Sequence, residues 1–371
     1  MPSGSAVVVK QLASQFSKDQ MVIVGEKVNY KNETTWGDEL PTIHRIKLKN
    51  ARLPKVGKFL KFVYIKRAVT EIKKIYNSNN CTSIVCVYPD EFFLFAGYLA
   101  SKSLKAPFYS WFHNSFVDNR QGIMKLFGKW LQKKVFEHSK KIFTISDGLS
   151  EFLKEKYPSY NFYTLKHGFK IPKSNHEPFI PRQDGKLNFA YTGSLNESCR
   201  EASVRLCKAI ISNHDYTLNI YTGFNQDLFR KYGIEGENVK HHGFISQKEF
   251  ERELAKNDIL LLPHGFDGAR TDAEYKTIFP TRTITLLYSD KPILCHSPKG
   301  TFITKFIEDN NCATLVTNKS EEEIKGAIEN IISDINATNQ KIVNSIKASK
   351  QFDVVETAKY LKSELKNDIE N

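Results

Sequence analysis

The chain has 371 residues, of which 40% are hydrophobic and 26% charged; this balance excludes a largely disordered chain, and the length predicts two domains of about 150–200 residues each. Its net charge of +13 comes from the first part, because residues 1–170 hold 28 Lys and Arg against 13 Asp and Glu, whereas the rest holds 26 against 28. No run of about 18 apolar residues occurs, and the N-terminal MPSGSAVVVKQ lacks a charged and then apolar leader, so we expect neither a membrane-spanning helix nor a signal peptide.

In chain order, short apolar runs alternate with amphipathic stretches, a pattern typical of parallel α/β folds. In the first half we predict helices over residues 5–16, 60–76, 91–103 and 123–137, and strands over 20–24, 83–87, 107–112 and 141–145, with residues 163–166 closing the half. In the second half we predict strands over 188–192, 218–221, 239–242, 259–262, 292–295 and 313–316, followed by a polar, helical stretch over 321–371. The predicted fold class is α/β, with two Rossmann-like, doubly wound parallel-sheet domains that face each other across a cleft.

The domain boundaries follow from a break in this pattern. Residues 171–185 contain three prolines and little periodicity, which predicts a linker. The N-terminal domain then covers residues 1–170 and the C-terminal domain residues 186–350, with a C-terminal helix and tail over 351–371. The first domain opens on the turn Pro2–Ser5 instead of a strand, so we expect it to lack its first strand.

One turn of the second domain is a candidate phosphate site. In open parallel sheets, ligands bind beyond the carboxyl ends of the strands. Gly193 and Ser194 follow a predicted strand and precede a helix that begins near Cys199. Backbone N–H groups at a helix N-terminus bind phosphate, and Arg200 would add positive charge. Glycine in such turns also serves geometry alone, so this signal is weak by itself.

A second candidate lies after residues 279–280, where Pro280 and Thr281 suit the start of a helix. Arg282 then lies in the first turn, where the helix dipole disfavours a cation. A bound anion would explain Arg282, and an ordinary surface arginine is the alternative.

His113 directly follows the aromatic strand 107–112. A histidine at the end of a strand is suited to acid–base catalysis, and a purely structural role is an equal alternative.

Six segments carry a family resemblance when read in order: PSGSAVVVKQLASQF, KKIFTISDGLSEFL, TLKHGFKIP, LNFAYTGSLN, VKHHGFISQKEFERELAKNDILLLPH and FPTRTITLLYSDKPIL. Together they resemble the large group of retaining GT-B glycosyltransferases that includes bacterial mannosyl- and glucosyltransferases. The resemblance implies that the second domain binds a nucleotide-sugar donor and the first domain the acceptor. It also implies that the anomeric configuration is kept, without a cofactor or metal, because amides and basic side chains neutralise the diphosphate.

The resemblance assigns the donor residues by position. Gly193, Ser194, Arg200, Thr281 and Arg282 would hold the donor, with Arg282 in place of a family lysine. Thr285 stands where the family has the glutamate that grips the ribose hydroxyls, and Ile278 stands where a partner acid is expected. Because a hydroxyl accepts hydrogen bonds less strongly than a carboxylate, ribose recognition would involve Thr285 or pass to Asp267, Asp272 or Glu274.

The acceptor side is assigned in the same way. His113 falls where the family has a histidine that contacts the transferred sugar or the acceptor, and His167 replaces an asparagine before a glycine. The predicted acceptor-cleft residues are Gly4, Ser5, Asp90, Asn114 and His167.

Two basic segments predict a membrane surface as a partner. Residues 51–76 and 122–141 mix Lys with Leu, Phe, Trp and Ile at helical spacing, as in helices that lie on anionic lipid. Alternatively, each helix packs its apolar face on the sheet and leaves its lysines in water. The six cysteines include no C-x-x-C pair and indicate free thiols in a reducing compartment. We therefore expect a cytoplasmic protein, peripheral at the inner face of the plasma membrane.

The predicted function is a glycosyltransferase that moves a sugar to a glycan or lipid-linked acceptor in cell-surface polysaccharide synthesis. The alternatives are a UDP-sugar 2-epimerase-like enzyme of the same architecture and a catalytically degenerate GT-B binding protein. No nucleic acid is expected as a partner, because the sequence has neither an RNA-type aromatic platform nor a DNA-reading helix pattern.

Overall fold

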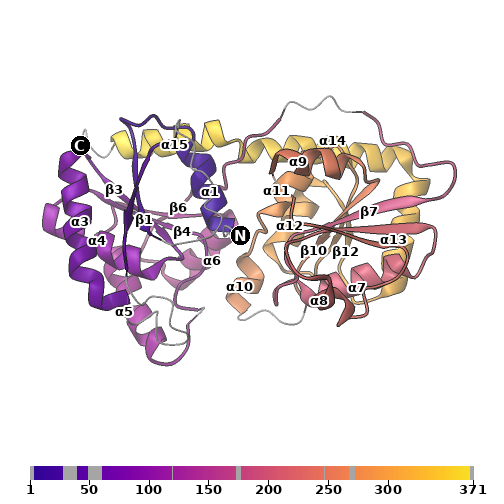
Figure 1. Ribbon diagram of the computed structural model, residues 1–371, viewed down its shortest axis with the longest axis horizontal. Helices are drawn as coiled ribbons and strands as arrows, with labels where there is room; N and C mark the ends of the chain where they lie inside the picture. The colour runs from indigo at the N-terminus through magenta and orange to yellow at the C-terminus, as the bar shows by residue number, and fades with distance from the viewer. Residues whose placement is uncertain are drawn as a thin grey trace. The chain divides into compact units, whose positions relative to one another are not determined.

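The computed structural model describes residues 4–27, 40–48, 61–118, 120–172, 177–245, 247–266 and 272–367. It forms two compact units. The N-terminal unit consists of residues 2–170 together with 353–371, and the C-terminal unit of residues 171–352. Both are α/β units whose strands are parallel, which confirms the predicted fold class (Figure 1).

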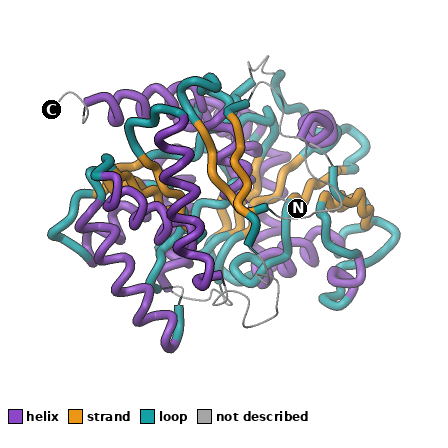
Figure 2. The backbone as a smooth tube through the Cα atoms, turned by 60° about the vertical axis from the view of Figure 1, so that its left-hand side comes forward, coloured by secondary structure: helices purple, strands orange, loops and turns teal. Residues whose placement is uncertain are grey.

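The strands of the N-terminal unit form two parallel sheets, β1-β2 and β3-β4-β5-β6, with helices around them (Figure 2). Its elements are α1 (Gly4–Ala13), β1 (Val22–Glu26), β2 (Thr42–Ile46), η1 (Lys61–Tyr64), α3 (Ile65–Ser78), β3 (Ile84–Tyr88), α4 (Glu91–Leu104), β4 (Phe108–Phe112), α5 (Gly122–His138), β5 (Lys141–Thr144), α6 (Asp147–Lys156), β6 (Phe162–Thr164) and α15 (Val354–Asn367). Strand β2 was not predicted. The expected lack of a first strand concerns the chain before α1, and residues 1–3 lie outside the described residues.

Side chains of Asp90 and Ser146 cap the first turns of two helices of this unit. The carboxylate of Asp90 accepts hydrogen bonds from the N–H groups of Phe92 and Phe93, both at 3.1 Å, and so starts α4. The hydroxyl of Ser146 accepts a hydrogen bond from the N–H of Leu149 and so starts α6. Both caps lie at carboxyl ends of strands, the edge where a ligand would bind.

The last helix belongs to the N-terminal unit although it follows the C-terminal unit in sequence. The N–H of Val354 donates to the carbonyl of Phe169, and Nζ of Lys362 donates to the carbonyl of Gln15 in the loop after α1. Gly168 has no side chain, which allows this approach: a Cβ there would lie 2.9 Å from a methyl carbon of Val354. The polar helical pattern of residues 351–371 does not indicate that this helix packs on the N-terminal unit.

The C-terminal unit is one six-stranded parallel sheet in the order β12-β11-β10-β7-β8-β9. Its strands are β7 (Leu187–Thr192), β8 (Tyr216–Tyr221), β9 (Val239–Gly243), β10 (Ile259–Pro263), β11 (Ile293–His296) and β12 (Thr314–Val316). Its helices are α7 (Arg200–Ile211), α8 (Gln226–Arg230), α9 (Gln247–Ala255), α10 (Asp272–Thr277), α11 (Arg282–Leu287), α12 (Phe302–Asn310), α13 (Glu321–Ser333), α14 (Ile335–Ser349) and η2 (Lys350–Phe352). All six predicted strands of this half are confirmed to within one or two residues.

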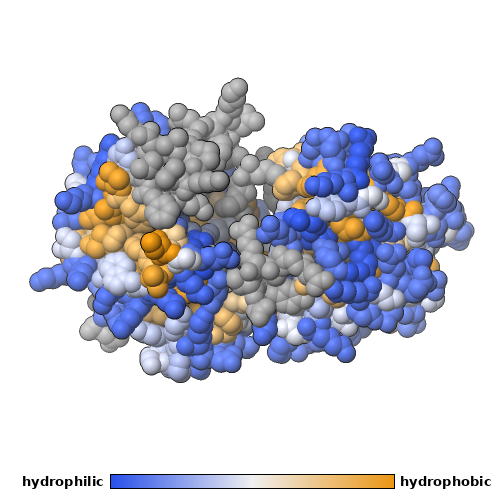
Figure 3. Space-filling model, turned by 90° about the horizontal axis from the view of Figure 1, so that it is seen from below, coloured by the Kyte–Doolittle hydropathy of each residue, from blue (hydrophilic) through white to orange (hydrophobic). Residues whose placement is uncertain are grey.

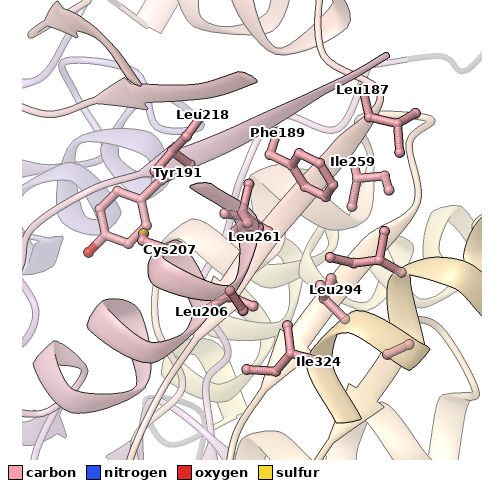
Figure 4. Packing of buried hydrophobic residues seen from close by; sticks show 14 of the residues in the cluster. Leu187, Phe189, Tyr191, Leu206, Cys207, Leu218, Ile259, Leu261, Leu294 and Ile324 are labelled. Carbon is pink, nitrogen blue, oxygen red and sulfur yellow. The ribbon is translucent and has the colours of Figure 1, made fainter. Parts of the chain in front are cut away.

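The core of the C-terminal unit explains why its strands read as continuous apolar runs. Leu187, Phe189 and Tyr191 of β7 are buried against Leu206 of α7 and Leu261 of β10 (Figure 4). All residues of β10 and β11 are buried, as expected for parallel strands covered by helices on both faces. Among the described residues, no helix is both long enough and apolar enough to cross a lipid bilayer.

Candidate functional site

The C-terminal sheet reverses its strand order between β7 and β10. The chain runs from β7 to β8 and β9 on one side and then places β10, β11 and β12 on the other. At such a switch point the connections leave in opposite directions and open a crevice beyond the carboxyl ends, where α/β proteins bind ligands. The crevice expected here lies after Thr192 and Pro263, the last residues of β7 and β10.

Arg282 lies at this switch point. Its Nη1 donates to the carbonyl oxygen of Thr192 and its Nη2 to that of Pro263, both at 2.7 Å. The guanidinium also lies over the ring of Tyr191, 5.8 Å from its centroid. The two carbonyl oxygens carry partial negative charge and so stabilise the guanidinium. This offsets part of the unfavourable interaction between the helix dipole and an arginine in the first turn of α11.

Gly193 is in contact with the same guanidinium. It has a φ of +92°, in the region that favours glycine. A Cβ at this position would lie 3.2 Å from Nη1 of Arg282. The N–H of Gly193 donates to the carbonyl of Tyr221 at 3.1 Å, so this amide, which the sequence offers to a phosphate, is already used within the sheet. Gly193 thus makes room for Arg282. An anion at the turn would have to bind groups other than the N–H of Gly193.

Residues of this turn and of the first turns of α7 and α11 include buried polar atoms without a partner in the described part of the chain. Among the described residues, four buried side-chain atoms here have no hydrogen-bond partner: Thr192 Oγ1, Arg200 Nε, Arg282 Nε and Thr283 Oγ1. Buried polar groups in proteins are normally paired, so a cluster of exceptions needs an explanation. Each of the four atoms belongs to a hydroxyl or guanidinium that can donate a hydrogen bond without losing an existing one, which suits a polyanionic ligand.

The other predicted donor residues have mixed settings. Ser194 continues the turn, and Arg200 is the first residue of α7, with its guanidinium 5.7 Å from the ring centroid of Tyr232. Thr281 precedes α11 without a side-chain capping bond. Thr285 lies inside α11 and is 5% exposed, which makes it about as buried as Thr192 and Thr283.

The predicted acidic substitutes cannot be placed in the same way. Asp267 lies outside the described residues, and Glu274 and Asp272 belong to helix α10, with their side chains outside the described part of the chain. Their assignment to the ribose stays a prediction.

In the N-terminal unit, His113 ends the buried strand β4 and is 7% exposed. Its ring packs edge-on against Trp111, with centroids 4.3 Å apart, and lies 6.5 Å from the ring of His167. Its Nε2 is buried, and no described residue forms a hydrogen bond with it. Burial, and then the neighbouring His167, lower the pKa of His113 well below its usual value. The imidazole is therefore neutral near pH 7, a weaker base than a free histidine, and able to take part in a hydrogen bond.

The remaining predicted acceptor residues are spread over the same unit. His167 follows β6 and is buried, which lowers its pKa to about 3. Asn114 is half-buried next to His113, whereas Asp90 is committed to capping α4. Gly4 and Ser5 form the first turn of α1. The structure thus brings His113 and His167 together, and each strand end from β3 to β6 contributes to one sheet edge.

These buried histidines predict that the N-terminal unit loses stability in acid. An unfolded histidine takes up a proton near pH 6.5, but the folded pKa of His167 is about 3. The free energy of unfolding should therefore have its full value above pH 6.5. As the pH drops from 6.5 towards 3, it should decrease by about 1.4 kcal/mol per pH unit for each such histidine. Urea unfolding at pH 7.5 and 5.0, followed by tryptophan fluorescence, measures this loss, because the three tryptophans, Trp36, Trp111 and Trp130, all belong to this unit. A His167→Gln variant should show a shallower dependence, and an unchanged slope would contradict it.

Sequence patterns did not indicate the set of unsatisfied atoms. Thr192 and Thr283 flank glycine and arginine residues that were predicted, but threonines in apolar stretches carry no distinguishing signal. Adjacency to Gly193 and Arg282 is what would have singled them out.

Comparisons with known proteins were made at the level of sequence and of structure. No protein-family model matches the chain, and the search of curated proteins also found no match. The structure is similar to that of HepE from Anabaena in complex with UDP, with a TM-score of 0.71 and 15% identity over 99% of this chain and 97% of HepE. It is also similar to sucrose-phosphate synthase from Thermosynechococcus elongatus, with a TM-score of 0.73 and 12% identity over 98% and 93% of the two chains. The lipopolysaccharide outer core galactosyltransferase WaaB, in its apo form, gives 0.59 and 15% over 94% and 99%.

The chain has the GT-B fold. This confirms the fold implied by the six resembling segments. In this GT-B chain, the β7–β10 switch point with Arg282 belongs to the C-terminal unit, and the His113–His167 pair belongs to the N-terminal unit.

Proposed function

We propose that this GT-B protein is a glycosyltransferase that uses a nucleotide-sugar donor, with the donor diphosphate bound at the β7–β10 switch point of the C-terminal unit. The observation that carries the proposal is the guanidinium of Arg282, which the carbonyls of Thr192 and Pro263 hold at that point. Side-chain atoms of Thr192, Thr283 and Arg200, in the adjoining turn and at the starts of α11 and α7, lack partners among the described residues. A diphosphate supplies many acceptor oxygens and negative charge, which match these donors. The likeness to HepE, which was solved with UDP and with UDP-glucose, supports the same donor class.

The chemistry assigned to this site is stabilisation of the leaving group. When the bond between the anomeric carbon and the diphosphate oxygen breaks, negative charge grows on the diphosphate. Fixed positive groups at the right place stabilise that charge in the transition state. Arg282 is held by two carbonyls and is thus oriented before the reaction. We propose that the reaction proceeds with retention of configuration and without a metal.

The nucleobase has a candidate platform next to this site. Phe224 and Phe244 follow β8 and β9, which are adjacent strands, and both side chains are exposed. Exposed aromatic rings at one sheet edge offer faces on which a base stacks. Their place beyond the carboxyl ends is the side on which the diphosphate is proposed to bind.

The N-terminal unit is proposed to bind the acceptor. His113 is neutral, and its Nε2 has no partner among the described residues, so a sugar hydroxyl that reaches the ring would pair with it. The acceptor hydroxyl must lose a proton as the new glycosidic bond forms, and a neutral imidazole assists that transfer. The proposed acceptor is a glycan or lipid-linked sugar in cell-surface polysaccharide synthesis, at the cytoplasmic face of the plasma membrane. The excess of 15 positive charges in residues 1–170 supports an anionic surface as its setting.

Titration calorimetry with UDP, GDP, TDP and CDP tests the proposal. We expect one of the four to bind with a dissociation constant in the micromolar range, about 1–100 μM, and to bind equally well with EDTA present. Turnover of the matching nucleotide-sugar with a lipid-linked acceptor should release the nucleoside diphosphate, and NMR should show the donor's anomeric configuration in the product. If none of the four diphosphates binds, the proposal is wrong. Conversion of free nucleotide-sugar to its 2-epimer would instead support an epimerase.

A further inference from the structure

The N-terminal unit exposes a group of large apolar side chains on one side of α5. We define the α5 face as Val63, Ile123, Leu126, Phe127 and Trp130. The exposed fractions are 77% for Val63, 74% for Ile123, 65% for Leu126 and 46% for Trp130. Figure 3 views the molecule from the side on which α5 lies in Figure 1 and shows orange apolar surface among blue polar side chains on this unit. Scattered exposed apolar residues are normal, but a contiguous group marks an interaction surface.

Helix α5 has two apolar sides, and the core needs only one. Ile123, Leu126 and Trp130 are spaced i, i+3 and i+7, which places them in one stripe. The core side is made by other residues, among them Leu131 and Val135, which are fully buried. Packing on the sheet, the alternative considered above for this segment, thus explains Leu131 and Val135 but not the exposed stripe.

The α5 face rests on a fixed aromatic base. The ring of Phe127 lies 5.3 Å from Phe62 and 5.9 Å from both Phe95 and Trp130. Phe62 precedes Val63 in η1, so these contacts join η1, α4 and α5 into one surface. A surface groove of about 440 Å³ continues from Trp130 towards Tyr98 and Lys102 of α4. Because the aromatic rings contact one another, Trp130 would lose little side-chain freedom on binding.

Lysines border the stripe. Lys125, Lys129 and Lys133 are exposed and spaced four residues apart along α5. Glu137 is the one acidic residue of α5, and it is paired with Lys133 at 3.7 Å and Lys134 at 3.0 Å. In the described part of the chain, Lys125 and Lys129 have no acidic partner within 4 Å. The helix therefore combines an apolar stripe with a row of positive charge.

We propose that the α5 face docks this protein on an anionic lipid bilayer. An amphipathic surface helix with Trp and Leu beside lysines lies in the interface plane, where the apolar stripe enters the acyl boundary and the lysines meet headgroup phosphates. A second copy of the chain fits the face less well, because a symmetric contact would bring the lysine rows of the two copies together. The docking proposal also names the surface that would bring the protein to a lipid-linked acceptor. Only this connection to the acceptor rests on the proposed function, and the docking itself does not.

Vesicle flotation of the full chain tests the docking. We expect binding to vesicles of phosphatidylcholine with about 30% phosphatidylglycerol, and little binding to phosphatidylcholine alone, because lysines near an anionic surface attract it. Binding should weaken between about 0.05 and 0.5 M NaCl, since screening shortens the reach of the charges. Fluorescence of Trp130 should shift to the blue when the stripe enters the interface.

Two double variants separate the contributions of the stripe and of the lysines. Ile123→Ser with Leu126→Ser should lower the partition coefficient at least about tenfold, and so should Lys125→Gln with Lys129→Gln. The matched controls are Ile335→Ser with Val343→Ser, two exposed apolar residues of the C-terminal unit, and Lys231→Gln with Lys240→Gln, two exposed lysines of that unit. The controls should bind vesicles like the wild type.

Three results would overturn the docking proposal: no binding of the wild type to the anionic vesicles, an equal loss in the controls, or a wild-type dimer that the Ile123→Ser, Leu126→Ser variant turns into a monomer. Calorimetry with UDP keeps the outcomes apart. A chain that binds UDP but not the vesicles disproves the docking alone, whereas one that binds vesicles but none of the four nucleoside diphosphates disproves the donor site alone.

Discussion

Replacing Arg282 with methionine should lower turnover of the nucleotide-sugar at least about 100-fold, the effect seen when one preorganised donor is removed from a transition-state site. The side chain lies at the switch point between β7 and β10 and is held there by the carbonyls of Thr192 and Pro263. Affinity for UDP should fall about 10- to 100-fold, because a charged hydrogen bond contributes about 1.5–3 kcal/mol. Calorimetry and a release assay for the nucleoside diphosphate measure the two effects.

A loss of folding has to be separated from a loss of phosphate binding. Arg282→Lys keeps the charge and should recover part of the affinity, and far-UV circular dichroism reports whether the variants remain folded. Uridine, which lacks phosphate, should bind the Arg282→Met variant as well as the wild type if only the diphosphate contact is lost. The matched control is Arg230→Gln, whose arginine is 54% exposed and paired with Asp227. Equal UDP affinity in the wild type and Arg282→Met would remove Arg282 from the donor site.

Replacing His113 with asparagine should lower turnover about 10²- to 10⁴-fold, the range for loss of a general acid or base, while UDP affinity stays unchanged. Turnover and UDP affinity should respond differently because His113 belongs to the N-terminal unit, whereas the proposed diphosphate site belongs to the C-terminal unit. Because the pKa of the buried imidazole is well below its usual value, the activity of the wild type should not fall through titration of His113 between pH 6 and 8.

Structural and catalytic roles of His113 predict different results. If the ring only fills space against Trp111, His113→Asn should lower the free energy of unfolding without changing the rate per folded molecule. The exposed His214 of the C-terminal unit provides the control His214→Asn, for which we expect no change. A variant that is folded, binds UDP and turns over like the wild type would leave His113 as a core residue.

Most strands and helices were predictable because burial imposes regular patterns. A parallel strand with helices on both faces is apolar throughout, which is why the runs ending at Thr192, Leu262 and Cys295 were recognisable. Strand β2, Thr42–Ile46, was missed because its polar and apolar residues follow no regular period and only Ile46 is buried. A strand with so little burial has a weak pattern to read.

The candidate site was only partly predictable. Gly193 and Arg282 were each suggested by local features, a turn after a strand and an arginine at a helix start. Their contact was not, because Arg282 lies 90 positions from Thr192 in the chain and the pairing depends on β7 and β10 being neighbours. Any residue type has a backbone carbonyl, so the sequence cannot indicate which carbonyls accept a hydrogen bond from Arg282. Only the folded sheet shows that they are those of Thr192 and Pro263.

The sequence was enough to determine the parallel α/β class of both halves, the turn at Gly193 and the basic character of the first half, because periodicity, glycine and charge act over a few residues. The tertiary structure decided the strand order that creates the switch point, the return of α15 to the N-terminal unit and the exposure of one apolar side of α5. Helical spacing shows that Leu126 and Leu131 lie on different sides of α5. Which side is covered depends on neighbours brought together from distant parts of the chain.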